Sequence, residues 1–270
     1  MGSRFSKRTI MYLPIPPQPD CVSAWRAAVQ AVDDRPGHEA QNVIIDVADP
    51  LVRSTLADPA VAIVDNFLRQ WDAKPIETVA NTLFPAALHR RHGSPAFYDR
   101  FTTRVLPAAA RGGDRWSGYY FERMINLPRP GGGVAFNQLA DIIGRLKDPS
   151  VKALNKFELS VFDPLRDVDR SPYGGQCLSH ASFKPERSTD GDRLHLTVMY
   201  RNHYYIEKLL GNLIGLGRLM AFVANEAELE VGALTVVSSH ATIDQPKNDA
   251  KQTAPRSAIK TMLEACDALV

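Results

Sequence analysis

The chain has 270 residues, of which 44% are hydrophobic and 23% charged, and its 32 basic and 30 acidic residues leave a formal net charge of +2. This length and apolar content predict a globular protein with a sizeable core. The balanced charge lacks the basic excess typical of proteins that bind nucleic-acid polymers, whereas a few local arginines suffice to bind one phosphate. No apolar run is long enough to span a bilayer. Three widely spaced cysteines without a recognisable secretory signal favour a reduced, cytoplasmic protein.

The first half of the chain is expected to be mainly helical, with one short strand. The proline-rich segment 14–19 predicts an extended stretch before a short helix at 24–33. The apolar run 42–47 predicts a buried strand. Further helices are expected at 59–71, from Pro75 onward, at 97–110 and at 137–147. We predict residues 1–40 to be an N-terminal extension with a short helix, and 41–270 to form a single domain.

The second half of the chain contains both the alternating pattern of apolar residues typical of strands and the spacing typical of helices. Strands are expected at 157–162, 176–183, 193–202 and 230–240, an apolar helix at 207–227 and a final helix at 254–269. Apolar and polar residues alternate along 193–202, which places Arg201 on the more polar face. There is no regular βαβ rhythm and no glycine fingerprint after the first strand, which argues against a dinucleotide-binding fold. The pattern predicts the α+β class, with a mixed twisted sheet packed with helices.

Residues suited to one kind of chemistry follow each other in the second half. Cys177 follows a glycine turn and begins a strand, Arg201 ends the next strand, and Asn212 and His240 come later. A thiolate can add to C6 of a pyrimidine ring, and a guanidinium can bind phosphate and lower the pKa of a neighbouring thiol. An amide can both donate to and accept from a base edge. These residues indicate sulfur addition to a phosphate-bearing pyrimidine.

The order of these residues resembles that of the thymidylate synthase family. The matching segments are Met199-Tyr200-Arg201-Asn202, Gly211-Asn212 and His240-Ala241-Thr242, with Arg201 and Asn212 at the family's spacing. Looser matches are Trp71 to Glu77 and Gly118-Tyr119-Tyr120. The resemblance is convincing over about 137–242, loose over 71–123, and absent before residue 60 and in the C-terminal tail.

The resemblance implies a thymidylate synthase-like fold that dimerises through the back of its main sheet. The substrate would be a pyrimidine nucleoside monophosphate, and 5,10-methylenetetrahydrofolate would donate a one-carbon unit to C5. Cys177 would be the nucleophile and Glu77 the general acid/base. The implied substrate-binding residues are Arg201, Asn202, Asn212, His240, Tyr120 and Lys156, the last at a position that the family takes from the second subunit.

Several positions depart from the family. Asn202 replaces the serine after the phosphate-binding arginine, the folate-contacting aspartate falls on Tyr204, and the tail ending at Val270 shows no closing segment. Because water enters such a site more easily, we expect a hydroxymethyl product first and a methyl product second. The alternative is a non-catalytic paralogue that binds a nucleotide without turnover.

Each candidate residue also has a structural interpretation. A free cysteine is usually an inert small hydrophobe, and a strand-end arginine is most often a solvated charge. Asn212 suits a helix cap, and Glu77 suits the first turn of a helix, where the helix dipole stabilises it. Cys21 and Cys266 lack the sequence context of Cys177 and are expected to be structural. No metal site is expected, and the group at 89–92 is interpreted as a solvated face or an extra phosphate contact.

Overall fold

A computed structural model of the chain describes residues 12–110, 119–168 and 175–269. Its centre is a twisted mixed sheet with strand order β1-β2-β7-β5-β4-β3, in which β6 also pairs with β7. The strands are β1 (Leu13–Pro14), β2 (Glu39–Val47), β3 (Phe157–Ser160), β4 (Leu178–Glu186), β5 (Arg193–Tyr200), β6 (His203–Tyr204) and β7 (Glu230–Thr242). The α+β class predicted from the sequence is confirmed.

The longer helices follow the periodicity of the sequence. They are α1 (Cys21–Asp33), α2 (Pro59–Gln70), α3 (Ile76–Leu83), α4 (Ala86–His92), α5 (Ala96–Arg100), α6 (Leu106–Ala110), α7 (Tyr120–Ile125), α8 (Gln138–Lys147), α9 (Pro164–Asp167), α10 (Leu210–Glu226) and α11 (Arg256–Asp267). Shorter helical turns are η1 (Pro36–His38), η2 (Phe101–Val105) and η3 (Tyr205–Leu209). The apolar helix expected at 207–227 is thus η3 continued by α10.

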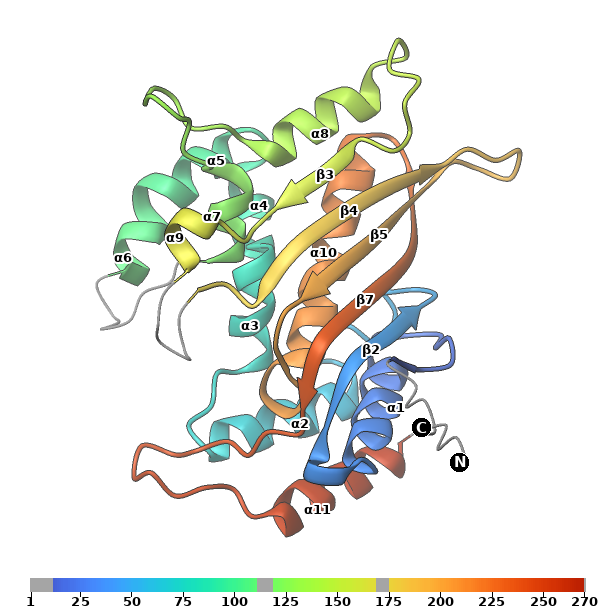
Figure 1. Ribbon diagram of the computed structural model, residues 1–270, viewed down its shortest axis with the longest axis vertical. Helices are drawn as coiled ribbons and strands as arrows, with labels where there is room; N and C mark the ends of the chain where they lie inside the picture. Colours follow the sequence, from blue (N-terminus) through green and yellow to red (C-terminus); the bar gives the residue numbers. More distant parts are fainter. Residues whose placement is uncertain (1–11, 111–118, 169–174, 270) are drawn as a thin grey trace, which may run out of the picture.

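One face of the sheet carries the core. Figure 1 shows α10, α3 and α1 on the same side of the strands, with α10 running behind β4, β5 and β7. Alternation along β5 explains this arrangement: Leu196, Val198 and Tyr200 point into the core, while Met199 on the opposite face is 46% exposed. In the described part of the chain, the helices named above leave that opposite face of β5 open to solvent.

The N-terminal segment shares this core. β1 pairs in parallel with β2 through Leu13 and Val43, and α1 packs against β2 and α10. Trp25 of α1 is fully buried, and its indole nitrogen donates a 2.9 Å hydrogen bond to the carbonyl of Tyr205. The helix expected within residues 1–40 therefore supports the turn that leads into α10.

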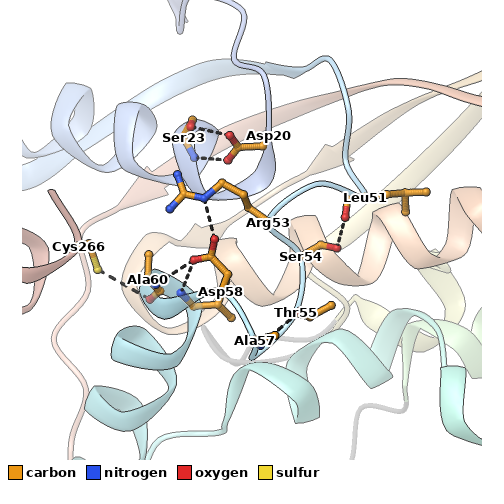
Figure 2. A network of polar contacts seen from close by, with 11 residues as sticks. Asp20, Ser23, Leu51, Arg53, Ser54, Thr55, Ala57, Asp58, Ala60 and Cys266 are labelled. Atoms are coloured by element: carbon orange, nitrogen blue, oxygen red, sulfur yellow. Dashed lines mark hydrogen bonds and ion pairs between the residues drawn. The ribbon is translucent and has the colours of Figure 1, made fainter. Parts of the chain in front are cut away.

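A capping carboxylate fixes the turn that leads into α2. Asp58 accepts hydrogen bonds from the backbone of Ala60 at 2.9 Å and from Arg53 Nε at 2.7 Å, as Figure 2 shows. Cys266 Sγ lies 3.9 Å from the carbonyl of Ala60, and burial raises its thiol pKa to about 11. Burial likewise raises the pKa of Cys21. Both cysteines are free and buried, which agrees with the structural role expected for them.

Candidate functional site

The sheet topology brings distant parts of the sequence to one end of the strands. β4 runs antiparallel to β5, and β5 runs parallel to β7, so the start of β4 lies beside the ends of β5 and β7. The register pairs Leu178 with Tyr200, and Tyr200 with Ser238. Cys177 and Arg201, one residue beyond these paired positions, therefore meet at this end of the sheet, as the site prediction requires.

Cys177 and Arg201 are joined through the backbone. The amide of Arg201 donates a 2.9 Å hydrogen bond to the carbonyl of Cys177, and its Nε donates a 2.9 Å bond to the carbonyl of Gln176. Arg201 is nevertheless exposed, and Cys177 is half-buried. A planar guanidinium held in this way can bind an anion next to the thiol.

The pKa of the Cys177 thiol is raised, whereas the sequence led us to expect it to be lowered. Burial raises the pKa of Cys177 above its ordinary value, while the positive charges of Arg201 and Lys208 lower it. Burial outweighs the two cations, so the thiol is mostly protonated at neutral pH. The predicted effect of Arg201 is present, but it does not by itself produce a thiolate.

Two tyrosine side chains lie next to the thiol. Tyr120, the first residue of α7, takes a hydrogen bond from the backbone amide of Leu178, and its ring meets the Tyr200 ring edge-on at 6.2 Å. Burial raises the pKa of both phenols, so both hydroxyls stay neutral. The sequence indicated Tyr120, but it placed Tyr200 among the apolar positions of a strand and so missed its closeness to Cys177.

Asn212 belongs to a buried polar network that the sequence did not reveal. Its Nδ2 lies 2.9 Å from His203 Nε2, and His203 Nδ1 lies 3.0 Å from Ser238 Oγ, which also accepts from the Tyr205 hydroxyl at 3.2 Å. Because an amide nitrogen only donates, Nε2 accepts and the imidazole proton is on Nδ1. Burial lowers the pKa of His203 to about 3, so the ring is neutral. The amide expected to contact a pyrimidine base thus has a protein partner.

Asn202 and His240 contact each other. His240 Nδ1 lies 2.9 Å from Asn202 Oδ1, and its Nε2 lies 3.3 Å from Glu39 Oε2. The His240 side chain is 40% exposed. Two of the implied substrate-binding residues are therefore neighbours, one just after β5 and the other in β7.

Glu77 is held in an ion pair. Both of its carboxylate oxygens accept from Arg218, at 2.9 and 2.8 Å, and these bonds lower the pKa of Glu77. Arg218 follows Asn212 by six positions on α10, which rotates its side chain by about 240° around the helix and moves it about 9 Å along the axis. Glu77 therefore contacts a different face of α10 from the one that carries Asn212 to His203.

Within one chain, Lys156 lies far from the other candidate residues around Cys177. It is exposed and immediately precedes β3, whose first residue Phe157 pairs with Phe183 near the far end of β4. Phe183 follows Cys177 by six positions along an extended strand, which corresponds to about 20 Å. Only a second chain could bring a Lys156 to Cys177.

Two surface hollows of about 620 and 480 Å³ are lined entirely by other residues. The larger contains Lys152 and Arg187, and it lies beyond the C-terminal end of α10, at Ala227. Asn212, near the start of that helix, is about 22 Å from Ala227 along its axis. Neither hollow belongs to the Cys177 site.

Within the described ranges, no group of three or more histidine, cysteine, aspartate or glutamate side chains could hold a metal ion. In the same ranges, no helix has both the length and the apolar character needed to cross a membrane. No protein-family model matches the chain, and no curated protein matches its sequence significantly.

Proposed function

We propose that this protein is a C5 one-carbon transferase that acts on a pyrimidine nucleoside monophosphate through a cysteine adduct at C6. The observation that supports the proposal best is the backbone bond that holds half-buried Cys177 beside exposed Arg201. A nucleotide phosphate bound by Arg201 keeps the attached base near the thiol. The resemblance of these segments to thymidylate synthases supports the same assignment.

The chemistry starts with loss of the Cys177 proton to solvent. Sγ then forms a bond to C6, and the electrons of the C5=C6 double bond move to C5 and the O4 carbonyl, which makes C5 a nucleophile. Once C5 carries the one-carbon unit, it loses its proton to solvent, and elimination of the thiolate from C6 restores the C5=C6 double bond. Arg201 and Lys208 favour the ionised thiol, and they oppose the effect of burial.

We propose 5,10-methylenetetrahydrofolate as the one-carbon donor, although the residues present fit it poorly. Tyr204 stands where the resemblance implies a folate-binding aspartate, and it is 37% exposed. The C-terminal helix α11 packs against α2, and Arg26 Nη2 lies 2.6 Å from Asp267 Oδ1, which anchors that helix to α1. A closing segment over the Cys177 site is therefore not evident in the described part of the chain. Hydroxymethyl is the proposed product, with methyl second.

Tritium release from C5-labelled dUMP, dCMP, UMP and CMP, with and without the folate, tests the proposal. Wild type should release tritium from one of them, and Cys177→Ser should reduce the release to background. Cys266→Ala, which alters a buried thiol near α2, is the matched control and should retain activity. Absence of release from all four nucleotides contradicts the proposal.

The second candidate is a non-catalytic nucleotide-binding paralogue. Three observations favour it: the raised pKa of Cys177, the engagement of Asn212 by His203, and the ion pair of Glu77 with Arg218. A fluorinated dUMP separates the two candidates. An adduct on Cys177 seen by mass spectrometry supports the transferase, whereas calorimetric binding without an adduct supports the paralogue.

The remaining proposals concern partners and location. We propose a cytoplasmic homodimer, formed through the open face of the sheet around Met199, with no nucleic-acid polymer or membrane as partner. Met199→Lys should then shift the sedimentation of the protein from dimer to monomer.

Mixing Cys177→Ser with Lys156→Ala chains tests whether Lys156 acts in the second subunit. Activity should reappear in the mixture, because one of the two sites in each mixed dimer is intact.

A further inference from the structure

Tyr200 has a hydroxyl without a hydrogen-bond partner among the described residues. Its side chain is fully buried, and its oxygen is shielded from water. Buried polar groups are nearly always paired, because an unpaired one has lost water without a replacement. Such a group at the end of β5, next to the candidate nucleophile, indicates a partner that forms in another state of the site.

The Tyr200 ring is held in place. It stacks on the His203 ring at 4.1 Å with an interplanar angle of 14°, and it meets the edge of Tyr120 at 6.2 Å. Leu178 pairs directly with Tyr200 across the strands, which places the start of β4 alongside it. The hydroxyl interacts electrostatically with Cys177 and Tyr120. These contacts hold the ring near Cys177, close enough for the two groups to influence each other's ionisation.

We propose that Tyr200 is a positioning residue whose hydroxyl donates a hydrogen bond to Sγ of Cys177 when that thiol ionises. A neutral thiol is a weak acceptor, whereas a thiolate is a strong one, which explains why the hydroxyl has no partner in the protonated site. The inference depends on the nucleophilic role of Cys177 in the proposed function. It assigns a role to Tyr200, which the resemblance did not place among the catalytic or substrate-binding residues.

The other groups around Cys177 act differently. The Tyr120 oxygen already accepts hydrogen bonds from the backbone of Leu178 and Cys177, so among the described residues it has partners in the protonated site that the Tyr200 oxygen lacks. Arg201 and Lys208 act on the thiol through their charge. Burial raises the pKa of Tyr200 well above its usual value, so it keeps its proton and remains a donor. The Cys177 proton passes to solvent. Salt screens the charges of exposed Arg201 and half-buried Lys208 more strongly than it weakens a buried hydrogen bond.

The pH dependence of Cys177 alkylation by iodoacetamide tests the inference. In this reaction the thiolate sulfur forms a bond to carbon and iodide leaves, so the rate follows the ionised fraction. Tyr200→Phe should shift the profile upward by about one pH unit, equivalent to about tenfold slower alkylation at pH 7. Tyr120→Phe, the matched control, should shift it less. Peptide mass spectrometry assigns the reaction to Cys177 rather than to Cys21 or Cys266.

Raising the salt concentration to about 0.5 M should move the profile of both proteins upward, and the difference between wild type and Tyr200→Phe should persist. Tyr200→Phe removes an atom without a partner, so its melting temperature should not fall. If the phenylalanine variant does not fold, Tyr200→Met offers a second variant that lacks the hydroxyl, although it also replaces the ring that stacks on His203. Identical alkylation profiles in wild type and the folded variant overturn the inference, as does a Cys177 that remains unreactive at high pH.

The alkylation assay contains no nucleotide and no folate, so it is independent of the tritium assay. A shifted alkylation profile without tritium release refutes the proposed transferase and keeps the link between Tyr200 and the thiolate. Tritium release with an unshifted profile keeps the transferase and refutes the role of Tyr200. Each result therefore bears on one of the two statements.

Discussion

Asn212 Nδ2 lies 2.9 Å from His203 Nε2, and both side chains are buried. The pair connects the first turn of α10 with β6, and through Ser238 it reaches β7. If a pyrimidine base is to hydrogen-bond the Asn212 amide, it must share this side chain with His203. The same bond thus stabilises the site and limits access to it.

Replacing Asn212 by alanine should destabilise the protein even without a nucleotide. His203 Nε2 then loses its donor inside the core, which costs about 1–3 kcal/mol. Urea unfolding measures the change in the free energy of unfolding. Asn225→Ala alters an exposed asparagine of the same helix and should stay within about 0.5 kcal/mol of wild type. Equal losses in the two variants contradict a structural role for Asn212.

His203 should make the protein less stable in acid. Burial lowers its pKa from 6.5 to about 3 in the folded state, so between these values only the unfolded chain binds the proton. Its contribution to stability is complete above pH 6.5 and decreases by up to about 1.4 kcal/mol per unit as the pH falls toward 3. Urea unfolding from pH 7 to 4 should show this slope in wild type relative to His203→Gln. A constant difference between the two proteins contradicts the prediction.

Asp244 should make the protein less stable as the pH rises, which is the opposite of the effect of His203. It accepts from the backbone amides of Ile206 and Glu207 at 2.8 and 3.2 Å, and burial raises its pKa from 3.8 to about 7. The folded chain therefore binds this proton more tightly, so the contribution is complete below pH 3.8 and is lost as the pH rises through 7. Asp244→Asn should abolish this loss. Relative to wild type, the variant should become progressively more stable from pH 4 to pH 8 in urea unfolding. An unchanged difference over this range refutes the raised pKa.

The overall pattern of helices and strands could be predicted because most elements are long enough to show a period. α10 and β7 were expected within a few residues of their bounds, and Pro75 marked the start of α3. The two-residue strands β1 and β6 have no such signal, because pairing with β2 and β7 alone defines them. α7 is similarly short and showed no period.

The candidate site was only partly predictable. Cys177 and Arg201 carry recognisable chemistry, so their order in the sequence indicated that they meet. His203, Ser238 and Tyr200 matter through contacts between strands that only the fold brings together. Tyr200 in particular follows the apolar alternation of its strand, and nothing in that pattern distinguishes the tyrosine that we propose as a donor to the thiolate from an ordinary core tyrosine.

Glu77 should be tested together with its partner. If its role is the ion pair with Arg218, then Glu77→Gln and Arg218→Gln should lower tritium release equally, because each removes one charge of the same ion pair. If Glu77 moves protons to the substrate, Glu77→Gln should lower kcat by about 100-fold or more, and Arg218→Gln should act far less. Comparing kcat for the two variants decides between these roles. Equal values of kcat exclude a separate catalytic role for Glu77.

Close packing between α3 and α10 depends on two glycines. A Cβ at Gly211 would lie 2.7 Å from Val79 Cβ, and one at Gly215 would lie 2.8 Å from the Ala80 carbonyl oxygen. Gly211→Ala should therefore destabilise the protein by about 1–3 kcal/mol, although alanine favours helix. Gly144→Ala in α8, where a Cβ meets nothing within 4 Å, should stabilise it by about 0.5–1 kcal/mol. Urea unfolding of both variants checks the sign. A stabilising Gly211→Ala contradicts close contact at this helix pair, since helix propensity alone would then account for both results.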